Sequence, residues 1–533
     1  MKSPVKIRVL VSDPLGERGV NILKQEKALQ VDVVTGLSES ELKKIIPQYD
    51  AIVIRSSTKL TKDILETAKK LRIIGRAGVG VDNVDLDAAT KQGIIVMNTP
   101  EGNTISTCEH TLSMLMAMAR NIPQANQSVK KGEWNRGKFM GTELHGKVLG
   151  VIGLGRIGRQ IALRAAGFGM EVIGYDPFIA KESFKGGVAL VSFEELLKKS
   201  NFITVHVPLT DQTKGMIGLK QFELMQKGVY VLNCARGGII NEKALYDAIQ
   251  SGKVRGAALD VFENEPPKNN LLLTLDQVIA TPHLGAATQE AQENVAIAVA
   301  QQVADALFDR GIKDAINVPS LDAESFRVLR PWVNLAERLG LFYSQYFGGS
   351  FREVSIRYGG EVTKYKLEPL TIAVLKGLLA PICGEGVNFV NAPALARERS
   401  IVVNESRTTQ IEDFSNFIQL EVAVNGDRNV VMGTLFGNQD PRIVRINDFR
   451  LDAVPTGVVL VIHNEDLPGV VGHVGTILGK NKINIAEMTL GRLQKGKKTF
   501  ALTVINTDND IPVKVLKELK SFKPIIEAKV VKL

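Results

Sequence analysis

The sequence predicts an α/β protein with two doubly wound, parallel-sheet (Rossmann-like) domains, followed by an α+β domain and a ferredoxin-like βαββαβ domain. Three observations support this prediction. Strand-like and helix-like segments alternate from residue 6 to about residue 284. A glycine-rich turn, GLGRIG, stands between a strand and a helix at residues 153–158. Residues 456–533 run strand, helix, strand, strand, helix, strand.

The first unit, residues 6–100, alternates regularly between strands and helices. Strands are expected at residues 6–13, 29–36, 50–57, 71–80 and 93–100, and helices at residues 20–25, 38–48 and 61–70. A long, largely buried helix at residues 103–120 then leads into a second α/β unit, and a helix at about residues 287–310 follows that unit. Beyond Pro319, helices such as residues 328–345 mix with short strands, so the α/β pattern ends there.

Length and composition indicate a globular protein with three or more domains. The chain has 533 residues, of which 44% are hydrophobic and 23% charged. The net charge of +9 is spread along the chain without a basic block, which favours attraction of anionic metabolites over binding of nucleic acid. No apolar stretch reaches the roughly twenty residues that a membrane span needs.

Cysteine usage indicates a reducing compartment. Cys108, Cys234 and Cys383 are far apart and odd in number, so neither a disulfide framework nor a paired zinc site is predicted. The N-terminal segment lacks a signal cleavage pattern. We therefore expect a cytoplasmic protein without a bound metal.

The stretch at residues 147–176 has the features of a dinucleotide-binding unit. Gly153 permits a tight turn, Gly155 lets a pyrophosphate approach the backbone, and Gly158 lets the helix pack closely on the strand. Glycines alone would also fit an ordinary turn, but strand, turn, helix, second strand and Asp176 occur in the required order. An acid at this position, with no Arg or Lys directly after it, favours NAD over NADP.

Three ionisable residues closely follow strand-like runs of the second unit. Arg236, Glu265 and His283 would therefore meet at the carboxyl-end edge of one sheet. Individually each would fit a capping or surface position; together they suit the oxidation of a 2-hydroxy acid. Arg236 would bind the substrate carboxylate with two hydrogen bonds. His283 would accept the hydroxyl proton, and Glu265 would orient the imidazole and favour its protonated form.

Four motifs in order resemble those of the D-isomer-specific 2-hydroxyacid dehydrogenases. They are GLGRIG at 153–158, NCARGGII at 233–240, AALDVFENEPP at 257–267 and TPHLGAAT at 281–288. The resemblance implies the same roles for Arg236, Glu265 and His283, and a substrate domain made of two separate segments. The cofactor contacts that it implies are Gly153, Gly155, Arg156, Ile157, Gly158, Asp176, Val207, Cys234, Ala235, Arg236, Asp260, His283 and Gly285.

Two arginines of the first unit are candidate substrate-binding residues. Arg55 and Arg76 follow strand-like runs and suit a phosphate group, although each alone would fit a surface position. Their contexts, IRSST and GRAGVGVDNVD, resemble the D-3-phosphoglycerate dehydrogenases within this family. The resemblance implies phosphate binding by both, a substrate contact at Gly78, and a contribution of Arg136 from a neighbouring subunit. Val79 departs from the threonine that relatives often carry.

The C-terminal part resembles the regulatory tail of the long-form enzymes. Residues 384–407 resemble their intervening domain, and residues 456–533 resemble an ACT domain, which binds amino acids between copies. The matching effector positions, for L-serine, are Asn464, Asp466 and Asn484; a simple turn and cap is the alternative for the first two. The predicted domains are substrate-binding (1–102 and 287–318), NAD-binding (103–286), intervening regulatory (319–453) and ACT (454–533).

The resemblance thus implies NAD-dependent oxidation of 3-phosphoglycerate in serine biosynthesis by a homo-oligomer, a dimer or a tetramer. Two alternatives remain open at the level of the sequence. One is a dehydrogenase of another D-2-hydroxy acid, which the paired arginines and the tail argue against. The other is an NAD-sensing corepressor-like regulator, a class that resembles only about the first 320 residues.

Overall fold

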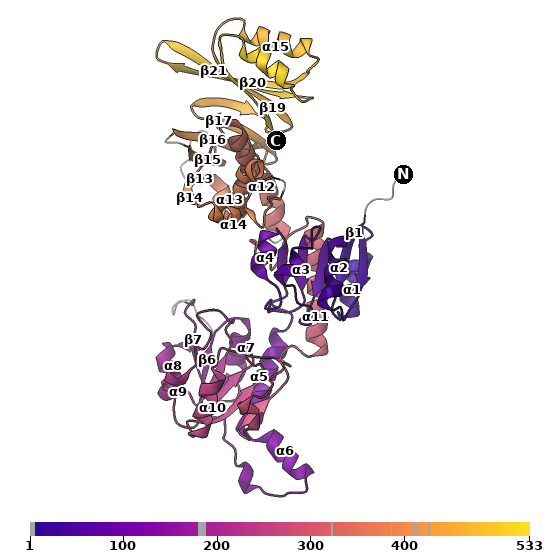
Figure 1. Cartoon of the computed structure of the whole chain (residues 1–533). Helices are drawn as coiled ribbons and strands as arrows, with labels where there is room; N and C mark the ends of the chain where they lie inside the picture. The colour runs from indigo at the N-terminus through magenta and orange to yellow at the C-terminus, as the bar shows by residue number, and fades with distance from the viewer. Residues whose placement is uncertain (1–5, 180–187, 321–322, 385, 409–413, 425–426) are drawn as a thin grey trace.

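The computed structural model describes residues 6–179, 188–320, 323–384, 386–408, 414–424 and 427–533. These residues form four sheets of five, seven, six and four strands, which Figure 1 shows as successive bodies of one elongated molecule. The predicted fold class is confirmed. The exact domain bounds stay predictions. Residues 1–5 of the predicted substrate-binding domain, and residue 385 within the range 384–407 named above, lie outside the described residues.

The first two sheets contain short strands with helices between them. Their strands are β1 (Ile7–Val11), β2 (Leu29–Val33), β3 (Ala51–Ile54), β4 (Ile73–Arg76), β5 (Ile95–Asn98), β6 (Val148–Ile152), β7 (Glu171–Tyr175), β8 (Ala189–Leu190), β9 (Phe202–Val205), β10 (Val229–Asn233), β11 (Val254–Leu259) and β12 (Val278–Ala280). Their helices are α1 (Glu17–Gln25), α2 (Glu39–Ile45), α3 (Lys62–Leu65), α4 (Leu86–Lys91), α5 (Thr104–Ala119), α6 (Ile122–Lys130), α7 (Arg156–Ala166), α8 (Phe193–Lys199), α9 (Leu219–Leu224), α10 (Glu242–Gln250) and α11 (Gln289–Leu307). Short 3-10 helices are η1 (Ile46–Gln48), η2 (Gly137–Phe139) and η4 (Leu271–Thr274).

The first sheet is parallel throughout, in the order β2-β1-β3-β4-β5. Its central strand β3, with the sequence AIVI, is buried along its whole length, as expected for a strand that is covered on both faces. Helix α11 returns from the second sheet to cover this one. Its Val295, Val299 and Val303 share a buried cluster with Val9 of β1 and Val53 of β3.

The second sheet is also parallel, in the order β12-β11-β10-β9-β6-β7-β8. The direction of winding reverses between β6 and β9, so a crevice opens beyond the carboxyl ends of these strands. The helix predicted at residues 103–120 is α5, and its buried Cys108, Leu112 and Leu115 pack on this sheet. It joins the first sheet to the second.

Two short helices of this region, α4 and α6, were not predicted, and α3 ends earlier than the predicted residues 61–70. Helices of one or two turns are marginal on their own, and their sequences show no long 3.6-residue period. The capping of α4 is instead a local event, in which the Asp85 side chain accepts a hydrogen bond from the Ala88 N–H.

The third and fourth sheets contain the remaining elements. Their strands are β13 (Glu353–Gly359), β14 (Val402–Thr408), β15 (Phe417–Val424), β16 (Asp427–Phe436), β17 (Asp440–Ile446), β18 (Phe449–Ala453), β19 (Val458–Glu465), β20 (Ile485–Lys495), β21 (Lys498–Thr507) and β22 (Ile525–Lys532). Their helices are α12 (Ala323–Tyr346), α13 (Glu368–Cys383), α14 (Ala392–Glu398), α15 (Val470–Lys480) and α16 (Val513–Lys520), with the 3-10 helix η5 (Gly360–Lys364).

The third sheet is mixed, because β13 pairs in parallel with β14 and antiparallel with β15. The fourth sheet is antiparallel in the order β20-β21-β19-β22, which confirms the predicted βαββαβ arrangement. The two sheets share one hydrophobic core: Val461 and Leu502 of the fourth belong to the same buried cluster as Ile443 and Phe449 of the third. They are therefore packed as a single unit.

The third sheet's unit touches the first through polar contacts. The Asn388 Nδ2 donates to the carbonyl of Gly93 at 3.0 Å, and Lys91 of α4 lies 3.7 Å from Glu398 of α14. Figure 1 shows α14 beside α4. Within the described part of the chain, no helix combines the length and apolar character that crossing a membrane requires.

Candidate active site

The predicted catalytic residues lie at the carboxyl ends of neighbouring strands. Arg236 follows β10, Glu265 follows β11 and His283 follows β12. These strands are parallel neighbours, so their carboxyl ends meet at one edge of the sheet. Each strand ends a few residues before its functional side chain, which leaves that residue in a loop that other contacts must hold in place.

Glu265 and His283 form a direct pair. The Nδ1 of His283 lies 2.8 Å from Oε2 of Glu265, and the Phe262 N–H donates to Oε1 at 3.2 Å. Within the described residues, the other ring nitrogen of His283, Nε2, has no hydrogen-bond partner. The histidine side chain is 47% exposed, so Nε2 is accessible to a substrate hydroxyl.

The turn that carries His283 is held by the carboxylate of Asp260. His283 has a left-handed backbone (φ +56°), and its N–H donates to the Asp260 carbonyl at 2.9 Å. The Asp260 side chain accepts from the N–H groups of Leu284 at 2.7 Å and Gly285 at 2.8 Å. Thr281 donates to it at 2.6 Å, and His110 Nε2 of α5 lies 3.1 Å away.

These contacts keep Asp260 charged although it is buried. Burial raises the pKa of its carboxyl, but hydrogen bonds from His110, Thr281 and the Leu284 N–H outweigh this effect, so the net pKa is below its usual value. The described partners of this carboxylate all belong to the protein. The cofactor contact predicted for Asp260 stays a prediction, and the residue has a structural role beside it.

Arg236 is held by a residue of the first sheet's unit. Its Nε donates to Oδ2 of Asp82 at 3.0 Å, and its Nη1 donates to the Ala235 carbonyl at 2.7 Å. Its Nη2 lies over Gly80, where an added Cβ would come within 1.8 Å. We did not predict Asp82. The run GVGVDNVD contains two aspartates, and nothing in the sequence shows which of them faces the second sheet.

Arg76 adds to the positive charge beside Arg236. Burial, followed by the nearby charges of Arg236 and Arg55, lowers the pKa of Arg76 to about 10, which still leaves it protonated at neutral pH. Asp82 and Asp13 partly offset this effect. The cluster is thus a concentrated positive site that suits an anionic ligand.

Local hydrogen bonds hold the backbone at Arg55 and at the other predicted substrate residues. The loop at Arg55 is held by Asp13, whose Oδ2 accepts the Arg55 N–H at 2.6 Å. The Gly78 N–H donates to Thr99 Oγ1 at 2.7 Å. Arg136 lies just before η2, and no contact among the described residues joins it to Arg55, Arg76 or Arg236.

The glycine turn has the geometry that a dinucleotide needs. Gly153 has φ +90°, and a Cβ on Gly158 would come within 2.0 Å of the Gly153 carbonyl oxygen, so the strand and α7 approach closely only with glycine here. The space beside Gly155 is open. It lies directly before Arg156 and Ile157, where α7 begins with free N–H groups. These residues fit a bound pyrophosphate.

Asp176 directly follows β7, where a ribose would lie. Its Oδ2 accepts the Leu154 N–H at 2.9 Å and its Oδ1 accepts the Phe178 N–H at 3.0 Å. Each carboxylate oxygen can accept more than one hydrogen bond, so a ribose hydroxyl can still bind. These two contacts fix the carboxylate beside the glycine turn.

The remaining predicted cofactor positions surround the same crevice. Val207 follows β9, and Cys234 and Ala235 follow β10. Burial raises the pKa of the Cys234 thiol to about 12, so it stays protonated. Burial also lowers the pKa of His206, next to Val207, to about 3, so this imidazole is neutral. Both side chains are uncharged parts of the crevice wall.

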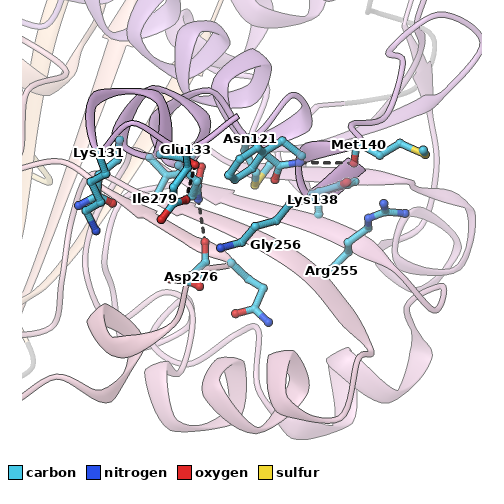
Figure 2. Close-up of a pocket in the computed structure, with 16 residues that line it drawn as sticks. Asn121, Lys131, Glu133, Lys138, Met140, Arg255, Gly256, Asp276 and Ile279 are labelled. Atoms are coloured by element: carbon cyan, nitrogen blue, oxygen red, sulfur yellow. Dashed lines mark hydrogen bonds between the residues drawn. The ribbon is translucent and has the colours of Figure 1, made fainter. Parts of the chain in front are cut away.

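A hollow of about 430 Å³ lies away from these residues. Figure 2 shows it between the segment after α5 and the strands of the second sheet; Asn121, Lys138 and Met140 line one side and Gly256 and Ile279 another. Its strand residues stand at the amino-terminal parts of β10, β11 and β12. This is the edge opposite the catalytic residues, so the hollow is distinct from the active-site crevice.

The structure brings together two of the three predicted effector residues. Asn464 and Asp466 line a cavity of about 20 Å³. Asn464 is buried, and its Oδ1 has no hydrogen-bond partner within the described residues. Asp466 accepts a hydrogen bond from Arg492 Nε at 2.6 Å. Asn484 does not line this cavity; its Nδ2 donates to Asp508 at 2.7 Å.

Three family models match successive parts of the chain. Residues 112–285 match the model "D-isomer specific 2-hydroxyacid dehydrogenase, NAD binding domain". Residues 328–447 match "D-3-phosphoglycerate dehydrogenase intervening domain", and residues 458–523 match "ACT domain". The fold and the site therefore define an NAD-dependent dehydrogenase of the D-2-hydroxyacid class.

Relatives of similar length show which family within this class the chain belongs to. The chain is 46% identical to D-3-phosphoglycerate dehydrogenase of Methanocaldococcus jannaschii over 529 residues, which cover 99% of this chain and 100% of the relative. It is 44% identical to the Bacillus subtilis enzyme of the same name, over 99% of both chains. The chain belongs to the D-3-phosphoglycerate dehydrogenase family.

Solved structures of related enzymes share its fold. A D-lactate dehydrogenase from Aquifex aeolicus, complexed with NAD and lactic acid, is 31% identical with a TM-score of 0.52, and the match covers 57% of this chain and 96% of that one. An NAD-dependent formate dehydrogenase from Staphylococcus aureus, in complex with NAD, is 30% identical with a TM-score of 0.54, covering 59% and 100%. NAD is the cofactor of this chain's class.

The contact between Asp82 and Arg236 generates a first prediction. Asp82→Ala removes the carboxylate that orients Arg236, so we expect kcat/KM for the hydroxy-acid substrate to fall roughly fivefold. This equals about 1 kcal/mol, the upper end for a partly exposed ion pair. Steady-state kinetics with NAD in excess measure it. Asp87→Ala, an exposed acid on α4, is the matched control. Equal kcat/KM values in both variants would contradict the role of Asp82.

Proposed function

We propose that this chain oxidises D-3-phosphoglycerate to 3-phosphohydroxypyruvate with NAD, the first step of L-serine biosynthesis. The observation that carries the proposal is the cluster of Arg55, Arg76 and Arg236, in which Arg236 lies at the same sheet edge as the His283–Glu265 pair. An acid–base pair beside several guanidinium groups suits a hydroxy acid with a second anionic group. The full-length similarity to enzymes of this name supports the same substrate.

The proton would be taken by His283. Glu265 binds Nδ1, so Nε2 faces the substrate and accepts the hydroxyl proton as the carbon–hydrogen bond breaks. The positive imidazolium that forms is stabilised by the adjacent carboxylate of Glu265. Gly153, Gly155 and Asp176 would hold NAD, which would supply the hydride acceptor for carbon 2. The protein's part in the reaction is to place the base and receive the proton.

The arginines would bind the two anionic ends of the substrate. Arg236 binds the carboxylate with two parallel hydrogen bonds, which a guanidinium provides and an ammonium does not. Arg55 and Arg76 bind the phosphate. Arg76 stays charged in its partly buried position, and a bound anion there would offset the repulsion among the three cations.

The alternatives account for fewer of these features. A dehydrogenase of another D-2-hydroxy acid, such as glycerate or lactate, has no evident use for a second anion site at Arg55 and Arg76. An NAD-sensing corepressor-like regulator would not require the His283–Glu265 pair. The intervening domain and the ACT domain that this chain matches also favour the proposed function over both alternatives.

We also propose feedback inhibition by L-serine at the ACT domain. The unpartnered Oδ1 of Asn464 and the carboxylate of Asp466 beside the small cavity suit an amino acid. Asn484 would contribute from outside this cavity, across an interface between copies. The cavity of about 20 Å³ is smaller than an amino acid, so binding would require the Asp466–Arg492 contact to open.

A homo-oligomer, a dimer or a tetramer, is part of the same proposal. The segment from α6 to η2 extends from the body in Figure 1. It exposes 77% of Trp134 and 75% of Met140, an apolar surface that suits a second copy. Arg136 lies on this segment and would reach the partner's substrate site.

We propose a cytoplasmic location, consistent with the three free cysteines, although two Arabidopsis thaliana relatives are named chloroplastic.

The acid–base role yields a second prediction. We expect His283→Ala to lower kcat by roughly 10²–10⁴, the usual contribution of a general base, while the Kd for NADH changes far less than kcat. Initial rates and fluorescence titration with NADH measure the two effects. His145→Ala, at an exposed histidine of the same sheet's unit, is the control. An unchanged kcat would remove His283 from the mechanism.

The phosphate assignment yields a third prediction. Arg55→Ala and Arg76→Ala should each lower kcat/KM for 3-phosphoglycerate on the order of 10–100-fold, the contribution of one charge-assisted hydrogen bond. Activity with glycerate or D-lactate should fall much less. NAD reduction with the three substrates, each with and without L-serine, tests this. Arg72→Ala removes an exposed arginine from the same segment as a control. Equal losses for all substrates would refute the assignment.

The effector site yields a fourth prediction. Asp466→Ala and Asn484→Ala should each raise the L-serine concentration for half-inhibition by roughly 10-fold or more, since each removes a polar contact to the effector. Each variant's own rate without serine is the reference. Lys514→Ala, on the exposed face of α16, should retain the original response. Unaltered inhibition in both variants would place the serine site elsewhere.

A further inference from the structure

The loop that carries Glu265 needs support from outside itself. It runs from the end of β11 at Leu259 to the start of η4 at Leu271 without helix or strand. Glu265 lies near its middle and must hold its Oε2 at 2.8 Å from His283. Because a displacement of about 1 Å can cost a catalytic group its effect, the contacts that fix this loop bear directly on catalysis.

Two points of this loop, one on each side of Glu265, are bound by one carboxylate, that of Glu242. Its Oε1 accepts the backbone N–H of Glu263 at 2.7 Å. Its Oε2 accepts Nδ2 of Asn270 at 2.7 Å. Glu263 stands just before Glu265, and Asn270 stands just before η4. The side chain of Glu242 therefore connects two points of the loop, one on each side of Glu265.

The position of Glu242 on a helix makes this connection rigid. It is the first residue of α10, where the helix dipole favours a negative charge. The adjacent Asn241 caps the helix by accepting the Ala244 N–H at 2.8 Å. The acceptor is thus attached to a capped helix and its charge is stabilised there, whereas the loop that it binds has no regular structure of its own.

A second contact joins the same loop to the segment after Arg236. A Cβ on Gly237 would come within 1.9 Å of the Phe262 carbonyl oxygen, so the two backbones touch where only glycine fits. The Phe262 N–H in turn donates to Oε1 of Glu265. The loops of Arg236 and Glu265 are therefore packed against each other and against the start of α10.

From these contacts we propose that Glu242 is a positioning residue for the reaction, which fixes Glu265 against His283. The inference rests on the catalytic roles proposed above for Glu265 and His283. Glu242 acts through the loop, since its two carboxylate oxygens accept one hydrogen bond on each side of Glu265. A carboxylate is required because both partners are donors. In a glutamine, the amide NH₂ would face one of these donors without an acceptor.

Glu242→Gln tests the proposal with little change in shape. We expect kcat to fall roughly 10–100-fold, the effect of misplacing a catalytic group by about 1 Å. The Kd for NADH and the unfolding midpoint should stay close to the original values. Asp247→Asn is the matched control, because it removes a carboxylate from the same helix where the partner is the exposed Lys243. It should retain the original kcat.

A second substitution restores the interaction with its polarity reversed. In the double variant E242Q/N270D, the oxygen of the introduced amide accepts the Glu263 N–H, and its NH₂ donates to the carboxylate that N270D introduces. That carboxylate also keeps an acceptor for the Leu272 N–H, which Oδ1 of Asn270 accepts in the original chain. We expect the double variant to regain most of the kcat that Glu242→Gln loses, which a general loss of stability would not allow.

The outcomes separate this inference from the proposed function. If His283→Ala loses activity but Glu242→Gln does not, Glu242 has no positioning role and the mechanism stands. If Glu242→Gln lowers kcat, NADH affinity and the unfolding midpoint together, or if N270D fails to rescue it, the residue is structural and the inference is wrong. If His283→Ala is fully active, the mechanism itself fails, and the inference fails with it.

Discussion

The buried carboxylate of Asp260 is the interaction on which the active-site geometry depends. It accepts hydrogen bonds from two consecutive backbone N–H groups after His283, so the left-handed turn of that histidine is fixed. His110 extends the network to α5, and Ser106 of α5 donates to the Gly285 carbonyl. A buried charge is tolerated because it is fully hydrogen-bonded. Helix α5 joins the two sheets, so the histidine turn is attached to the connection between them.

Opposite charges from the units of the first two sheets meet beside the candidate active site. Arg236 comes from the second sheet and contacts Asp82 of the first. Arg76 and Arg55 of the first sheet's unit lie near it; burial lowers the pKa of Arg76, and the charges of Arg236 and Arg55 lower it further. The three arginines repel one another. Asp82 and Asp13 reduce this repulsion at Arg76, and a bound anion would reduce it further. A bound anion would therefore interact with cationic groups from the units of both sheets.

The sequence predicted the fold, and the shared sheet edge of the candidate catalytic residues, for physical reasons that operate locally. A glycine turn and residues after buried strands must occupy the carboxyl-end edge of a parallel sheet, so Gly153, Glu265 and His283 could be assigned without coordinates. Asp82 could not, because its importance comes from a partner far away in the chain. The same is true of Glu242, whose spacing from Glu265 carries no periodic signal. Short helices such as α4 and α6 depend on tertiary contacts and were missed for that reason.

The ACT domain is connected to the unit of the first sheet through the third sheet. The third and fourth sheets share a hydrophobic core, and tightly packed cores transmit displacement rather than absorb it. Their unit meets the first through Asn388 at the Gly93 carbonyl and Glu398 at Lys91, at the end of α4. The loop before α4 carries Asp82. Polar contacts of this kind contribute little net stability, so the junction is held more weakly than the core that the third and fourth sheets share. Helix α4 thus carries the contact with the third sheet's unit at one end, and the loop before it carries the aspartate that orients Arg236.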